Sequence, residues 1–181
     1  MAETPSSMIP LGTPMPTFSL PEASGKQWKP SQQKTGYLVL FICNHCPFVI
    51  HVAKTLCEIT SNCDALNIEM VCINSNDQDA YPADSTKKMI ETASEFDWTF
   101  PYLVDETQKI AIAFGATCTP DIFLYDADQK LFYRGQFDDS RPKMGTSDGR
   151  DLLVALKELE LGNSPPEVQK PAIGCNIKWK L

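Results

Sequence analysis

Leu38-Val39-Leu40-Phe41-Ile42-Cys43-Asn44-His45-Cys46-Pro47-Phe48-Val49 is the stretch that predicts the fold of this chain. An uninterrupted apolar run, typical of a buried strand, ends in a Cys-x-x-Cys motif. Apolar residues then recur at helical spacing, at Val49, Val52, Ala53, Leu56 and Ile59. The pattern predicts a strand over residues 37–42 that delivers both cysteines to the start of a helix running to about Asn62. Free backbone N–H groups and the positive end of the helix dipole stabilise a thiolate there, so the pair is predicted to be redox-active.

A metal site and an inert core pair are the alternatives to redox chemistry. A structural metal knuckle needs a second Cys/His pair at knuckle spacing, and none is formed by the remaining cysteines, which are Cys57, Cys63, Cys72, Cys118 and Cys175. Two inert cysteines would not need a strand-to-helix junction. We therefore expect a redox site without a metal or cofactor.

Composition places the chain among ordinary globular proteins. Its 181 residues suffice for one domain with a sizeable core, and 43% of them are hydrophobic. The formal net charge of −7 argues against nucleic acid and anionic membrane surfaces as partners. No apolar run approaches the roughly 20 residues of a membrane span. Because 7 cysteines cannot all pair, a reducing compartment is favoured, and the cytoplasm is the expected location.

Strands and helices alternate along the chain, which predicts a three-layer α/β fold with the motif at the carboxyl end of a central strand. Residues 1–16 are expected to form a flexible leader, residues 17–164 one domain, and residues 165–181 a tail packed on it. Further elements are expected as a hairpin turning at residues 24–25, a strand over 68–74, a helix opened by Asp84, a strand over 100–104, a hairpin over 122–133 and a last helix ending at Gly162.

Short motifs over nearly the whole chain resemble the thioredoxin fold, and more closely its AhpC/TSA-type, peroxiredoxin-like branch that carries Cys-x-x-Cys. They lie at residues 12–21, 43–47, 73–77, 100–106, 119–120, 133–135, 138–139 and 171–179. The resemblance implies a thioredoxin-like fold with an N-terminal hairpin extension, an inserted helix and strand before the cis-proline loop, and a C-terminal tail. Thr119-Pro120 is that loop by resemblance, and it would face the cysteines with Cys118, a possible third redox cysteine, beside it.

The resemblance implies a thiol–disulfide oxidoreductase that uses a Cys43/Cys46 dithiol and disulfide. Protein thiols or disulfides, or a low-molecular-weight thiol, are the partners it implies. A peroxide reductase acting through Cys46 and a copper-handling protein of the same fold are the alternatives. Copper-delivery proteins of this fold use a longer cysteine spacing and a distant histidine, whereas only His45 and His51 exist here.

The chain departs from the peroxiredoxin pattern at positions that activate peroxide. With Cys46 as the peroxidatic cysteine, Cys43 stands where Thr or Ser is usual and Val39 where Pro is usual. The arginine expected just before the next strand is replaced by Pro120. Slow peroxide turnover is therefore expected. Thioredoxin's buried acid is replaced by Tyr37, so the sequence identifies no proton acceptor for Cys46.

Residues around the motif have expected roles. Cys43 should be the exposed attacking thiol, and Cys46 the resolving thiol close behind it. His45 should stabilise the thiolate and so make the disulfide more oxidising, as in oxidants of the DsbA type. The residues expected to tune the site are Asn44, His45, Thr119 and Pro120. Exposed positions are expected for His51, Arg134, Asp138 and Asp139, and a role as small core fillers for Cys57, Cys63 and Cys72.

The tail is too apolar for a free terminus. Ile177 and Trp179 should pack residues 171–181 onto the domain. Docking would bring Cys175 close to the domain, either as a half-buried thiol or as a third redox partner of Cys46. The sequence leaves both interpretations open.

Overall fold

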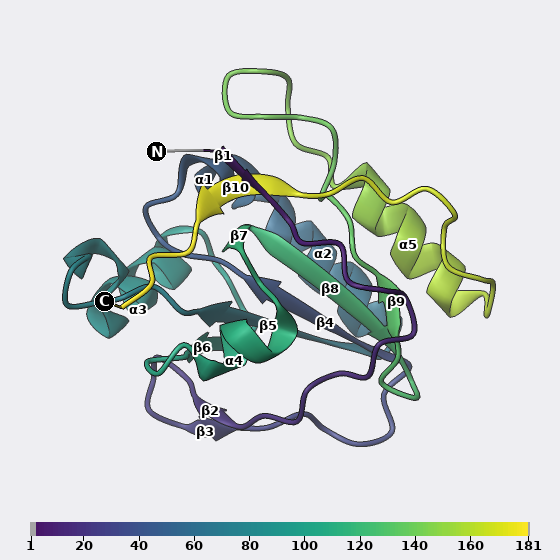
Figure 1. Cartoon of the computed structure of the whole chain (residues 1–181), viewed down its shortest axis with the longest axis horizontal. Coiled ribbons are helices and arrows are strands. Elements are labelled where there is room, and N and C mark those ends of the chain that lie inside the picture. The colour runs from purple at the N-terminus through teal and green to yellow at the C-terminus, as the bar shows by residue number, and fades with distance from the viewer. Residues whose placement is uncertain (1–2, 181) are drawn as a thin grey trace.

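A five-stranded sheet forms the centre of the molecule (Figure 1). The computed structural model describes residues 3–180. The strands lie in the order β6-β5-β4-β8-β9, with the bounds β4 Gly36–Phe41, β5 Ile68–Asn74, β6 Tyr102–Val104, β8 Asp121–Asp126 and β9 Leu131–Tyr133. Strands β4, β5 and β6 run parallel, and β8 runs antiparallel to β4. The predicted α/β class is confirmed.

Strand β4 is buried on both faces, which makes it the central strand. Its side chains alternate between two hydrophobic cores, because Leu38 and Leu40 point into one and Val39 and Phe41 into the other. The first core contains side chains of α1 (Pro47–Val52), α2 (Thr55–Ala65), α3 (Thr86–Glu95) and α5 (Arg150–Glu160). The second contains side chains of α4 (Lys109–Phe114) and of the hairpin β2 (Leu20–Pro21) and β3 (Gln27–Trp28). The described part of the molecule therefore has three layers: four helices on one face, the central sheet, and α4 with the β2–β3 hairpin on the other face.

The helix that follows the motif is interrupted, which the sequence did not predict. One continuous helix was expected to about Asn62, but α1 ends at Val52 and α2 begins at Thr55. The carbonyl of Ala53 accepts a hydrogen bond from the Trp98 indole at 2.9 Å. In a continuous helix that carbonyl would accept from the N–H four residues on, so this contact helps to separate the two helices. No helix among residues 3–180 is long and apolar enough to cross a membrane.

The N-terminal segment is attached to the domain from residue 3 onward. Strand β1 (Glu3–Pro5) pairs with β10 (Ile173–Asn176), and Ser6 N donates to Ala172 O at 2.9 Å. Met15 is 7% exposed. The expectation of a flexible leader is therefore wrong for residues 3–16, because backbone pairing and apolar burial hold them; residues 1 and 2 lie outside the described part.

The tail reaches the domain through a strand. Strand β10 lies between β1 and β7 (Cys118–Thr119), and Figure 1 shows it crossing the molecule beside α1. Ala172 and Ile177 are buried, whereas Trp179 is 41% exposed. Strand pairing and the buried side chains of Ala172 and Ile177 thus anchor the tail. Trp179 does not have the buried role expected of it.

Candidate active site at the strand-to-helix junction

The two cysteines of the motif lie at the junction that the sequence indicated. Cys43 follows the end of β4, and Cys46 is the N-cap residue of α1, with Pro47 at the first helical position. Proline suits this position because its missing N–H would have no helical partner there. Both sulfurs are buried, with Cys43 1% and Cys46 0% exposed. The expectation that Cys43 is exposed is therefore wrong; because both sulfurs are covered, burial does not decide which thiol attacks.

The loop at Thr119 and Pro120 covers both thiols. Their peptide bond is cis, as the resemblance implied. The Thr119 hydroxyl lies 3.4 Å from Cys43 Sγ, and the Cys46 thiol donates to the Thr119 carbonyl oxygen at 3.1 Å. One residue of the cis-proline loop thus contacts both members of the pair, which explains why neither sulfur is open to solvent.

Hydrogen bonding separates the acidities of the two thiols. A hydrogen bond from Cys43 lowers the pKa of Cys46 to about 5; burial opposes this, and donors at Cys175 and the Val49 N–H add to it. The pKa of Cys43 is raised well above its usual range, because its proton is held by Cys46, because it is buried, and because Asp84 lies nearby. These shifts favour Cys46 as the thiol that ionises first, which requires it to give up the proton that it donates to the Thr119 carbonyl oxygen.

Asp84 is the charged group that the sequence did not assign to the site. It was expected to cap a helix, but Ser85 is the N-cap of α3, and Asp84 ends the 3-10 turn η1 (Pro82–Asp84) with 0% exposure. Its carboxylate accepts from the Asn44 backbone N–H at 2.8 Å and from Asn76 Nδ2 at 2.7 Å. Its Oδ2 also lies 2.8 Å from His45 Nδ1. Asp84 therefore fixes the two residues between the cysteines.

The residues between the cysteines have further fixed partners. The Asn44 side chain donates to Ala83 O at 3.0 Å and accepts from the Tyr102 hydroxyl at 3.0 Å. The His45 ring stacks on Tyr81, with ring centroids 6.0 Å apart and planes 3° from parallel. The segment after β5 thus forms one wall of the site. Its position beyond the carboxyl end of a parallel strand was a signal that could have identified Asp84.

Cys43, His45 and Asp84 are the side chains that could hold a metal. Their ligand atoms all lie within 4.8 Å of one another. Two ligands of one tetrahedral zinc, each about 2.0–2.1 Å from the ion, lie roughly 3.3 Å apart. The 2.8 Å between His45 Nδ1 and Asp84 Oδ2 is instead the distance of a direct contact. As arranged, the cluster fits an acid–imidazole pair beside a thiol better than a metal centre.

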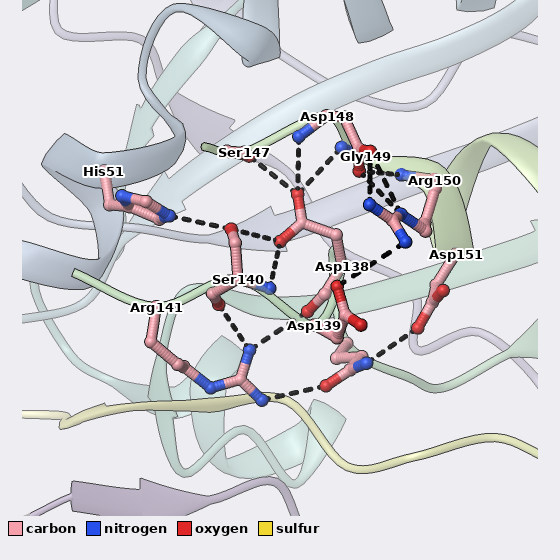
Figure 2. A network of polar contacts seen from close by, with 11 residues as sticks. His51, Asp138, Asp139, Ser140, Arg141, Ser147, Asp148, Gly149, Arg150 and Asp151 are labelled. Carbon is pink, nitrogen blue, oxygen red and sulfur yellow. Dashed lines mark hydrogen bonds and ion pairs between the residues drawn. The ribbon is translucent and has the colours of Figure 1, made fainter. Parts of the chain in front are cut away.

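A second polar cluster lies beside α1 (Figure 2) and is organised by Asp138. Although burial opposes it, hydrogen bonds from Ser140, Ser147 and the Asp148 and Gly149 N–H groups lower the pKa of Asp138 to about 2. His51 Nε2 lies 2.7 Å from the Ser140 hydroxyl. Because Ser140 donates its proton to Asp138, His51 is the donor in this contact. The expectation that His51 and Asp138 are merely solvent-exposed is wrong; Asp139 is exposed as expected.

A shallow cleft runs between this cluster and the cis-proline loop. Its walls include Phe48, Pro120 and Ile173, with His51 and Arg141 among the polar lining residues. Arg141 is held by Asp138 O at 3.0 Å and by Gln136 Oε1 at 2.8 Å. The cleft places an apolar floor and a polar edge next to the helix that begins at Cys46.

Arg134 was expected in a solvated loop, but it is fully buried. It forms an ion pair with Asp121, the residue after Pro120, and lies 3.9 Å over the Phe123 ring. Asp121 also accepts from the Ser6 hydroxyl at 2.7 Å. The ion pair thus ties the segment after the cis-proline to β9 and to the N-terminal segment.

The other cysteines divide into two groups. Cys63 and Cys72 are 0% exposed in the core, and Cys57 is half-buried, as expected of small fillers. Cys118 Sγ lies 3.9 Å from the Ser6 hydroxyl and 3.6 Å from Pro120 O, so it contacts neither motif cysteine. Cys175, by contrast, packs in the same buried core as the two motif cysteines, and its pKa is raised by burial and by Cys46.

Comparison with known proteins places this geometry in a family. Residues 11–134 match the AhpC/TSA family. The crystal structure of a hypothetical protein from Sinorhizobium meliloti 1021 is 39% identical, covers 98% of both chains and has a TM-score of 0.95. An uncharacterized conserved protein from Geobacillus kaustophilus is 43% identical, with a TM-score of 0.96 over 99% of this chain and 97% of its own.

More distant structures share the fold alone. Peroxidoxin BcpB from Mycobacterium tuberculosis is 17% identical and covers 85% of this chain and 98% of its own, with a TM-score of 0.63. The fold of the chain is thioredoxin-like. No curated protein matches the chain.

Proposed function

The chain belongs to the AhpC/TSA family, and from this premise we propose that it is a thiol–disulfide oxidoreductase working through Cys43 and Cys46. Family membership supports thiol redox chemistry in general. The observation that carries the specific proposal is the placement of both thiols at the start of α1, where one residue, Thr119, contacts the two sulfurs. A thiolate with a second thiol in contact is the arrangement that thiol–disulfide exchange requires.

The exchange follows from this geometry. The Cys46 thiolate attacks a partner disulfide, the partner's S–S bond breaks, and one partner sulfur leaves and takes up a proton. Cys43 then loses its proton and attacks the Cys46 sulfur, which expels the second partner sulfur as a thiol. Two cysteine thiols become one disulfide, and one partner disulfide becomes two thiols. The reverse sequence reduces the protein.

The sequence identified no proton acceptor for Cys46; in our proposal the Asp84–His45 pair is a proton acceptor for the other thiol, Cys43. The atoms of the pair lie within 4.8 Å of Cys43 Sγ, and Cys43 is the thiol that keeps its proton in the reduced site. In our proposal the pair takes the Cys43 proton when Cys43 attacks. The cleft lined by Phe48 and Pro120 is the place where a partner's chain would lie beside the thiols.

The proposal is tested by equilibrating the protein with glutathione buffers of known potential and mapping the disulfides by mass spectrometry. We expect one reversible two-electron step and a Cys43–Cys46 disulfide in the oxidised protein. The Cys63→Ser variant is the control for a buried cysteine outside the site. If Cys43 and Cys46 stay reduced in an excess of glutathione disulfide, the proposed function is wrong.

Alanine at position 45 is expected to lower the reduction potential of the Cys43/Cys46 couple by about 30 mV or more, a tenfold change in the equilibrium constant. His45 lies against Asp84, whose negative charge helps to raise the pKa of Cys43. Without the imidazole, nothing offsets the negative charge of the Asp84 carboxylate. That charge destabilises a thiolate in the reduced site, so the disulfide becomes easier to form. The same glutathione titration measures the shift. His51→Ala, the other histidine of the chain, is the matched control and should leave the potential unchanged; an equal shift in both variants would contradict this role for His45.

Peroxide reduction through Cys46 is the second candidate. The low pKa of Cys46 at a helix start favours it. Position 43 holds a cysteine where peroxide activation wants a hydroxyl, and Arg134 is committed to Asp121. Stopped-flow mixing of the reduced protein with low hydrogen peroxide should therefore show slow oxidation of Cys46. Rapid oxidation would make peroxide reduction the principal activity.

A further inference from the structure

We propose that Cys175 is a third redox thiol, which exchanges reversibly with Cys43 for the disulfide to Cys46 after the motif has been oxidised. This inference rests on the proposed function and extends it from the motif to the C-terminal strand. The observation that carries it is the strand pairing at Thr119, the residue around which all three cysteines gather.

Strand β10 places Cys175 directly opposite Thr119. The register of β10 against β7 pairs Cys175 with Thr119 and Asn176 with Cys118. Residues directly opposite each other in an antiparallel pair have their side chains on the same face. The Thr119 hydroxyl lies 3.4 Å from Cys43 Sγ, so this is the face that looks onto the motif. Cys175 packs in the same buried core as Cys43 and Cys46, which agrees with that placement.

The position of Cys175 is held from both sides. Strand β1 pairs with the other edge of β10, with Glu3 opposite Cys175. On the β7 side, a Cβ at Gly174 would lie 2.1 Å from the Thr119 carbonyl oxygen, so only glycine lets the two strands approach this closely. Cys175 itself is 3% exposed. The thiol is therefore a fixed neighbour of Cys46 and not a group on a trailing end.

Cys118 provides the contrast within the same pair of strands. Because neighbouring residues of a strand point to opposite faces, Cys118 points away from the face that carries Thr119 and Cys175. Its sulfur lies 3.9 Å from the Ser6 hydroxyl. Cys118 is equally buried and adjacent in sequence to the site, yet the fold gives it no partner thiol. It is thus a matched control for Cys175.

The transfer is an internal exchange that balances without an outside reagent. In the oxidised motif the Cys175 sulfur attacks the Cys46 sulfur, the Cys46–Cys175 bond forms, and the Cys43–Cys46 bond breaks. Cys43 leaves as a thiolate and takes up the proton that Cys175 gives up. No net oxidation occurs. Burial is the main cause that raises the pKa of Cys175, and Cys46 raises it further; only the contribution of Cys46 disappears once Cys46 is in a disulfide.

Serine variants of the full chain test the proposal, with glutathione disulfide as the oxidant. In Cys43→Ser, Cys46 should first form a mixed disulfide with glutathione, which Cys175 then displaces, so that peptide mapping finds a Cys46–Cys175 disulfide in most of the protein. In the double variant Cys43→Ser/Cys175→Ser, the glutathione adduct on Cys46 should persist. In Cys43→Ser/Cys118→Ser, the Cys46–Cys175 disulfide should form as in the single variant. Circular dichroism confirms that each variant is folded.

The outcomes separate this inference from the proposed function. A glutathione adduct that persists equally in Cys43→Ser and in Cys43→Ser/Cys175→Ser, while the wild-type protein forms Cys43–Cys46, would overturn the third-thiol role alone. A Cys46 that reacts with glutathione disulfide in no variant and not in the wild type would overturn both. A Cys46–Cys118 disulfide in the peptide map of Cys43→Ser would show that Cys118, and not Cys175, is the partner.

Discussion

Alkylation of the reduced protein with iodoacetamide at pH 6 is expected to label Cys46 ahead of every other cysteine. A thiol with a pKa of about 5 is roughly 90% thiolate at pH 6, whereas an ordinary thiol of pKa about 8.5 is about 0.3% thiolate. The lower intrinsic nucleophilicity of an acidic thiol cancels part of this advantage, which leaves a preference of roughly tenfold over an ordinary thiol. Burial lowers the rate at which Cys46 is labelled at every pH, but it does not change the pH at which that rate is half of its maximum.

The pH profile is the sharper measurement. The rate of Cys46 labelling should fall as the pH drops through about 5, because the thiolate is protonated there, and should be level from pH 6 to pH 8. Half-exposed Cys57, whose pKa is raised mainly by burial, is the internal control and should be labelled only in alkaline solution. In Cys46→Ser the acidic phase should disappear. Preferential labelling of Cys43 with a midpoint near 5 would restore the roles first expected from the sequence.

Replacement of Arg134 by methionine is expected to destabilise the fold by about 3–5 kcal/mol, the usual cost of removing one member of a buried ion pair. Arg134 and Asp121 are both 0% exposed. Without the guanidinium, the Asp121 carboxylate keeps only its hydrogen-bond donors, among them Ser6 and the Thr117 N–H. Urea unfolding followed by tryptophan fluorescence measures the loss, read as a lower midpoint at an unchanged m-value.

Arg150→Met is the matched control for this effect. Arg150 pairs with Asp148 at 2.8 Å, but both side chains are about half exposed, so the loss should be far smaller. A second variant, Arg134→Met/Asp121→Asn, should recover part of the stability because it no longer buries an unpaired charge. Equal midpoints for the Arg134 and Arg150 variants would show that the buried pair contributes nothing beyond a surface pair.

The sequence by itself determined the elements that depend on local patterns. The apolar run that ends at Ile42 predicted β4, and the Cys-x-x-Cys spacing predicted two thiols at the start of a helix. The cis bond at Thr119-Pro120 was implied by resemblance and is present. These features could be predicted because periodicity, helix termini and X-Pro bonds are properties of a few consecutive residues.

The tertiary structure decided which side chains share a site. Asp84 approaches Asn44 across 40 residues of sequence, Cys175 reaches Thr119 through pairing of β10 with β7, and Arg134 finds Asp121 across the β8–β9 hairpin. Nothing local distinguishes a buried aspartate from one that caps a helix, because only packing removes water from the carboxylate.

The division of roles between Cys43 and Cys46 was decided at the same level. By sequence position, the first cysteine of the motif should be the exposed thiol. In the fold, Thr119 contacts both sulfurs, and neighbours from separate segments, among them Cys43 and Cys175, lower the pKa of Cys46. The acidity of a thiol depends on the hydrogen bonds and charges within a few ångströms of its sulfur, and those neighbours exist only once the chain has folded.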